Sequence, residues 1–185
     1  MKCVLLLALA LAAPVSLAQG DAPDALVRAV TVEVINKIKQ DPELHEVDPA
    51  KVAALIETSI LPLFDFVHMT RLAMGRNWRL ATPEQKRVLS EEFRTMLVRS
   101  YAAALANYRG EVVDVKQLRV AALGTEAMVR SEVKQAGKEP MTLDYQMEKT
   151  ASGWKIYDVK VSGVSLVTTN RDLFAEKSRK AVWTA

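Results

Sequence analysis

The side chains that could do chemistry are few and are spread along the sequence. The two histidines are His45, in a polar stretch, and His68, which follows Asp65 by three residues and could share a helical face with it. A metal site usually needs three or four converging ligands, and no second histidine or cysteine is close to His68. We therefore interpret His68 as a helix-surface residue and expect no metal site.

Two aspartates on predicted strands could act as general bases if they faced a pocket, as in small cone-shaped α+β enzymes. Strict alternation places Asp144 on the face opposite Leu143, so we expect it to be solvated. Whether Asp158 faces a pocket or solvent stays open, because its face also holds Trp154 and Ile156. The sequence has no Gly-x-Ser-x-Gly elbow, no glycine-rich phosphate loop and no His-Glu-x-x-His. These features together predict a protein that is not an enzyme.

Charge gives little indication of a nucleic-acid partner. The chain has 25 Lys and Arg against 22 Asp and Glu, a net charge of +3. No dense basic cluster is interleaved with aromatic residues, so we expect no nucleic-acid binding.

The N-terminus is typical of an export signal. Lys2 precedes an apolar run over 4–13, and the small-residue triplet 16–18 predicts cleavage before Gln19. The apolar run is shorter than a membrane span. The single cysteine, Cys3, falls inside the signal, so no disulfide can form in the mature protein. We expect residues 1–18 to be a cleaved signal peptide and 19–185 to be a single soluble domain.

Four helices are predicted in the first part of the mature chain. Apolar residues every three or four positions indicate helices over 26–38 and 49–60, the second ended or kinked by Pro62. Asp65 is suited to cap a short helix that ends at Gly75. Thr82-Pro83-Glu84-Gln85 is a capping box that begins a long helix ending at Gly110.

After Gly110 the apolar period changes from 3.6 to 2, which indicates strands. The alternation and turns predict a four-stranded antiparallel meander, followed by a last helix over 170–182; the strands cover 112–120, 127–135, 141–148 and 154–161. Helices followed by strands indicate an α+β fold, with a helical layer on one face of the sheet.

The remaining unusual feature is a set of flexible and aromatic apolar residues, among them Met69, Met96, Met147, Phe66 and Tyr101. An ordinary core explains each residue taken singly. Periodicity cannot distinguish a filled interior from a lined cavity, and both readings stay open at this point.

Several motifs, in order, cover most of the mature chain: Leu61–Phe66, Gly75–Gln85, Trp154–Val159, Gly163–Val167, and Arg171 with Phe174 three residues on. Together they resemble the MlaC (toluene-tolerance) family of periplasmic phospholipid-binding proteins. One departure is Thr169-Asn170, which stands where that family usually has Asn-Tyr.

The resemblance implies a periplasmic carrier that moves phospholipid between the outer and inner membranes and so maintains outer-membrane lipid asymmetry. It implies an apolar pocket between helices and sheet, with bound phospholipid as cargo and no cofactor. It also implies two partners: an outer-membrane lipoprotein complex, and an inner-membrane ABC transporter with an MCE-domain protein. On this basis we expect the tail pocket to be lined by Phe66, Met69, Met96, Tyr101, Leu143, Tyr145, Met147 and Val159, and Arg171 to contact the phosphate.

Two rival functions are weighed against this one. An enzyme of ketosteroid-isomerase-like shape would place Asp, Tyr or His in the pocket, and Asp158 is its candidate residue. A periplasmic chaperone or lipoprotein carrier would bind protein instead of lipid.

Overall fold

The computed structural model describes residues 22–41, 49–106, 110–121 and 124–171. The predicted signal peptide falls outside these ranges, as does almost all of the predicted last helix over 170–182. None of the helices in the described ranges is both long and apolar enough to cross a membrane.

The first two predicted helices are present, but the second is irregular. Helix α1 spans Pro23–Gln40 and buries Val27, Val34 and Ile38 on one face. Helix α3 spans Pro49–Leu55 and widens into a π-helical turn, η1, at Ile56–Ile60, then tightens into the 3-10 turn η2 at Leu61–Leu63. The predicted helix over 49–60 is therefore present, but its last turn is π-helical, which the sequence did not indicate. Pro62 lacks an N–H to continue the helix, and the preceding turn changes its spacing.

The next two helices begin where their caps predict. Asp65 caps α4, Phe66–Met74, and its carboxylate accepts a hydrogen bond from the His68 backbone N–H at 2.8 Å. The turn η3, Gly75–Arg79, follows. Helix α5 spans Pro83–Ala106, and the Thr82 N–H donates to Gln85 Oε1 at 2.8 Å while the Gln85 N–H donates to Thr82 Oγ1 at 3.2 Å. The capping box is confirmed.

The sheet is antiparallel, with its strands in sequence order. They are β1 Val112–Val120, β2 Glu126–Lys134, β3 Met141–Thr150, β4 Gly153–Val161 and β5 Val164–Ser165. The predicted meander is confirmed, but its count of four omits β5, because a two-residue strand shows no alternation. A short helix that was not predicted, α6, Leu166–Thr169, follows β5.

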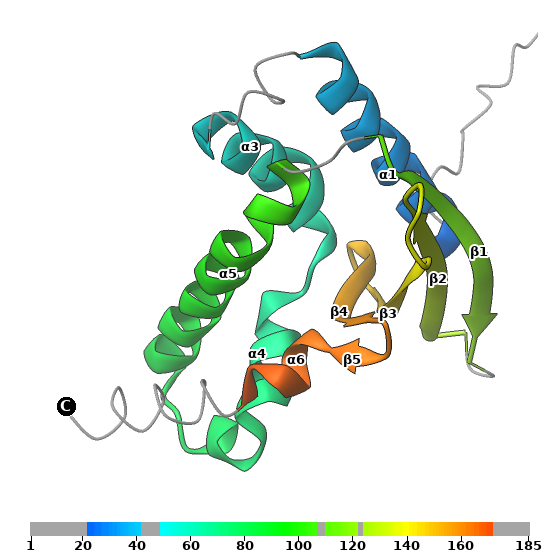
Figure 1. Cartoon of the computed structure of the whole chain (residues 1–185). Helices are drawn as coiled ribbons and strands as arrows, with labels where there is room; N and C mark the ends of the chain where they lie inside the picture. The colour runs from blue at the N-terminus through cyan, green and yellow to red at the C-terminus, as the bar shows by residue number, and fades with distance from the viewer. Residues whose placement is uncertain (1–21, 42–48, 107–109, 122–123, 172–185) are drawn as a thin grey trace, which may run out of the picture.

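The helices enclose one face of the sheet (Figure 1). Helix α1 packs on β1 and β2, whereas α4 and α6 pack on β4. In the same view α5 lies on the side opposite the sheet, and η1, η2 and α4 run between them. Buried residues fall into separate groups: one joins α4, α5 and α6, one joins α1 to the sheet, and one joins α1 to α3 and η1. The apolar interior is thus divided into several parts.

One irregularity in β4 decides which side chains face the helices. Gln146 pairs with Asp158 but the next residue, Met147, pairs with Ile156, so Tyr157 is an extra residue in a β-bulge. The bulge interrupts strict alternation. Val159 therefore follows Ile156 on the helix-facing side, and the expectation that Asp158 shares the face of Trp154 and Ile156 is wrong.

Candidate functional site

Two apolar cavities lie between the helices and the sheet. The first, of about 190 Å³, lies between α1 and the sheet and is lined by Val27, Val30, Thr31, Val34, Ile35, Ile38, Ile60, Leu63, Phe64, Val113, Leu143, Tyr145 and Ile156. The second, of about 240 Å³, lies between η1, α5 and the sheet and is lined by Ile56, Ile60, Leu61, Phe64, Phe66, Leu97, Val98, Tyr101, Leu143, Tyr145, Val159, Val161 and Leu166. Almost every lining side chain is hydrocarbon, so both cavities suit an apolar ligand.

The two cavities share one wall, made by Ile60, Phe64, Leu143 and Tyr145. Phe64 is held there by β4, because it forms a parallel bridge with Ile156 and the next residue, Asp65, donates its N–H to the Ile156 carbonyl at 2.9 Å. Its ring also stacks on that of Phe66, with centroids 5.7 Å apart. The irregular segment after α3 therefore fixes the partition between the cavities.

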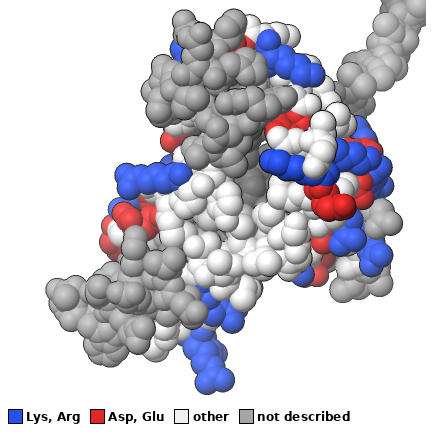
Figure 2. All heavy atoms as spheres, viewed as in Figure 1, with Lys and Arg blue, Asp and Glu red and all other residues white. Residues whose placement is uncertain are grey.

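Charged side chains lie around the cavities, and none is among the residues that line them. Figure 2 shows a broad uncharged area in the middle of one face, with Lys, Arg, Asp and Glu around it. The lining residues include two tyrosines, Tyr101 and Tyr145, and burial raises the pKa of both. The lining therefore presents hydrocarbon and neutral hydroxyl groups.

Five of the predicted pocket residues line the cavities: Phe66, Tyr101, Leu143, Tyr145 and Val159. The three methionines do not. Met69 and Met147 have no exposed surface and belong to packed groups, and Met96 packs against the group that contains Met69. Long flexible side chains fill gaps in an interior, which is what these three do, so the structure places them in the core.

Residues of α1 and of the irregular turns also line the cavities, although none of them was predicted as a site residue. Val30, Thr31 and Ile35 of α1 line the first cavity, and Ile60 and Phe64 line both. The apolar stripe of α1 was visible in the sequence. Its spacing could not show that part of the stripe faces empty space.

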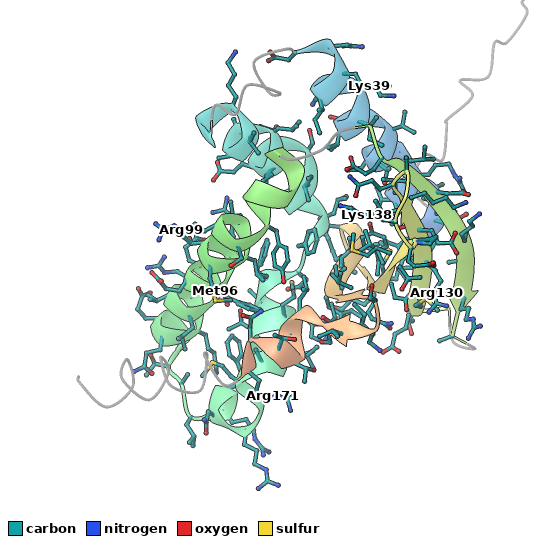
Figure 3. All side chains as sticks on the ribbon, in the orientation of Figure 1. Lys39, Met96, Arg99, Arg130, Lys138 and Arg171 are labelled. Atoms are coloured by element: carbon teal, nitrogen blue, oxygen red, sulfur yellow. The ribbon has the colours of Figure 1, made fainter. Side chains whose placement is uncertain are left out.

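Arg171 is not brought to either cavity. It is exposed and directly follows the end of α6, at the lower side of the view in Figure 3. Its contact with a phosphate stays a prediction that the described geometry does not support.

The expectation that Asp144 is solvated is wrong. It is buried, and Arg130, its partner across β2 and β3, donates to both of its carboxylate oxygens at 2.5 and 2.6 Å. The hydrogen bonds from Arg130 lower the pKa of Asp144. Alternation correctly removes Asp144 from the cavity face, but it cannot show that a long cross-strand side chain covers the carboxylate.

Asp158 does not line either cavity. Its carboxylate is buried and accepts a hydrogen bond from the Val167 N–H at 3.2 Å, near the start of α6. The candidate base of the enzyme alternative therefore stabilises a helix start.

The interpretation of His68 as a helix-surface residue is also wrong. Its Nδ1 lies 2.5 Å from Glu148 Oε1, and its ring stacks on Tyr157 with centroids 4.7 Å apart. Asp65, His68 and Glu148 offer three possible metal ligands within 4.8 Å of one another. These groups already bind each other or cap α4, which accounts for their positions as a connection between α4 and β3.

The fold and the cavities define a class of α+β protein in which helices hold an apolar hollow against one face of an antiparallel sheet. The MlaC protein family matches residues 28–182. The chain therefore belongs to the MlaC family.

Individual relatives agree with this assignment. The toluene tolerance protein ttg2D of Pseudomonas putida is 26% identical over 95% of this chain and 81% of its own length. The intermembrane phospholipid transport system binding protein MlaC of Haemophilus influenzae is 26% identical over 78% of this chain and 69% of its own. A phospholipid-binding protein from Ralstonia solanacearum, solved in complex with a phospholipid, is 42% identical with a TM-score of 0.77, covering 86% of this chain and 88% of the other.

Proposed function

We propose that this protein binds a phospholipid, with the acyl chains in the two cavities, and carries it through an aqueous compartment without chemical change. The observation that carries the proposal is the pair of apolar cavities with a common wall, in a chain 42% identical to a protein solved with a bound phospholipid. The buried aspartates support a role without catalysis, because Asp144 and Asp158 are both engaged in structural contacts away from the cavities.

A carrier protein lowers the free-energy cost of moving a phospholipid through water. Two acyl chains hold roughly 30 methylenes, and exposing each to water costs about 0.8 kcal/mol, so about 24 kcal/mol opposes free diffusion of the lipid. Cavities lined by hydrocarbon largely offset that cost. Release then requires a partner that offers a continuous apolar path.

The sequence extends the proposal to location and partners. A signal peptide at 1–18 would export residues 19–185, as one domain, to the periplasm. There the protein would exchange phospholipid with an outer-membrane lipoprotein complex and with an inner-membrane ABC transporter bearing an MCE-domain protein, and so maintain outer-membrane lipid asymmetry. The name of the Haemophilus influenzae relative supports this intermembrane role.

Native mass spectrometry of the protein purified from bacterial cells tests the proposal. We expect bound phospholipid in the wild type. Leu143→Trp should lose it, because this side chain lies in the wall shared by both cavities. The matched control is Val112→Trp on β1, where the side chain is 62% exposed and lines neither cavity.

Each alternative function predicts a different experimental result. Wild-type protein without lipid contradicts the carrier proposal. A bound peptide or protein instead of lipid would favour the chaperone. The enzyme alternative would be favoured by turnover of a small substrate that Asp158→Asn abolishes.

A further inference from the structure

One polar side chain stands in the wall between the two apolar cavities. Of the four residues that line both, Ile60, Phe64 and Leu143 offer only hydrocarbon, and Tyr145 offers a hydroxyl. Burial raises the pKa of Tyr145, so this hydroxyl keeps its proton and can donate a hydrogen bond. A donor at this place needs an acceptor, because an unpaired buried hydroxyl is unfavourable.

The second hydroxyl in the same place is Ser131 on β2. Ser131 pairs with Leu143, which makes it a diagonal neighbour of Tyr145 across the two strands, within reach of an aromatic side chain. It interacts with the Tyr145 hydroxyl and lowers the pKa of that group, against the larger effect of burial. The pair does not reach hydrogen-bond geometry. Ser131 is 0% exposed, and its Oγ has no hydrogen-bond partner within the described residues.

Buried polar groups in folded proteins are nearly always hydrogen-bonded. Ser131 itself lines neither cavity, so this pair of hydroxyls can reach a ligand only through Tyr145. This inference rests on the proposed function, in which the ligand is a diacyl phospholipid. Three parts of that lipid could contact the two hydroxyls. The acyl chains have no hydrogen-bonding atom. A charged phosphate would lose too much hydration in an apolar enclosure. The ester carbonyl is a neutral acceptor without a proton of its own.

We infer that Tyr145, with Ser131 behind it, binds an ester carbonyl of the bound lipid and places the glycerol backbone across the shared wall, so that one acyl chain enters each cavity. Each chain is joined to the glycerol through its own ester, so the esters are the polar groups nearest to the point where the chains diverge. A contact at the wall therefore positions both chains at once. Tyr145 is a specificity-determining residue that selects ester-linked over ether-linked chains.

A competition between two lipids tests this inference. Delipidated protein is mixed with equal amounts of a diester and a diether phosphatidylethanolamine of the same chain length, and the bound lipids are measured by mass spectrometry. Losing one hydrogen bond should make the ratio of ester to ether lipid about three- to tenfold lower in Tyr145→Phe than in wild type. The total lipid bound should change little, because the hydrocarbon contacts remain.

The matched control is Tyr157→Phe on β4, which removes a hydroxyl from a residue that lines neither cavity. It should keep the wild-type ratio. An equal ratio in wild type and Tyr145→Phe overturns the inference while leaving lipid carriage intact. A wild type that binds neither lipid overturns the proposed function itself, so the two failures are distinguishable.

Discussion

Met147 and Leu143 lie four residues apart on the same face of β3, yet they should respond to truncation in different ways. Met147 has no exposed surface and is packed on all sides by a group that includes Ile156 and Trp154. Leu143 is half-buried and borders both cavities. Replacing each by alanine therefore compares a filled interior with a lined cavity on one strand.

The expected losses follow from packing. Met147→Ala removes a fully buried side chain and leaves a new void, which typically costs about 2–5 kcal/mol of unfolding free energy. Leu143→Ala removes a side chain that already faces empty space, so it loses fewer close contacts, and about 1 kcal/mol is expected. For a domain of this size each kcal/mol lowers Tm by about 2–4 °C.

Urea denaturation of delipidated protein is the appropriate assay, because bound ligand would add stability of its own. We expect Met147→Ala to lower the unfolding free energy by at least about twice as much as Leu143→Ala. If both variants lose the same amount, Leu143 is packed as tightly as Met147 and does not border empty space.

Two further predictions concern stability. The hydrogen bonds from Arg130 lower the pKa of Asp144 in the folded protein, so their contribution is complete above the unfolded pKa of about 3.9 and is lost as the pH falls through the folded value. The gap in urea midpoint between wild type and Asp144→Asn should therefore be constant above about pH 5 and shrink below about pH 4; a gap that does not change with pH would contradict this. Thr82→Ala removes the acceptor for the Gln85 N–H and should lower the unfolding free energy by about 0.5–2 kcal/mol. Thr125→Ala, at an exposed threonine just before β2, is the control in thermal unfolding. An equal loss in the two variants would argue against the capping role.

Periodicity and capping residues predict most of the fold because they act locally. The stripe of α1, the caps at Asp65 and Thr82 and the alternation of β3 each depend on neighbours a few residues away. The errors concern relations across the chain. Alternation could not place Arg130 over Asp144, nor Glu148 beside His68, because both contacts depend on strand register and helix docking.

The candidate site shows the same difference between local features and contacts across the chain. Leu143 and Tyr145 line the cavities on the face that strand alternation assigns to them, whereas Val159 does so only because of the bulge, which alternation does not indicate. Met69 and Met147 were also expected to line the pocket, but both have no exposed surface, and a methionine fills a core as readily as it lines a pocket. Whether an apolar face meets a neighbour or empty space depends on the docking of α1 and α5 against the sheet, which no sequence pattern records.

The bulge at Tyr157 means that the apolar character of the second cavity depends on where β4 shifts its register as well as on its composition. If Tyr157 took a regular place in the ladder, strict alternation would turn Asp158 toward the helices and Val159 away from them. A carboxylate would then enter a hydrocarbon enclosure without any change of sequence. The pairing of one residue thus decides whether this hollow presents hydrocarbon or an acid.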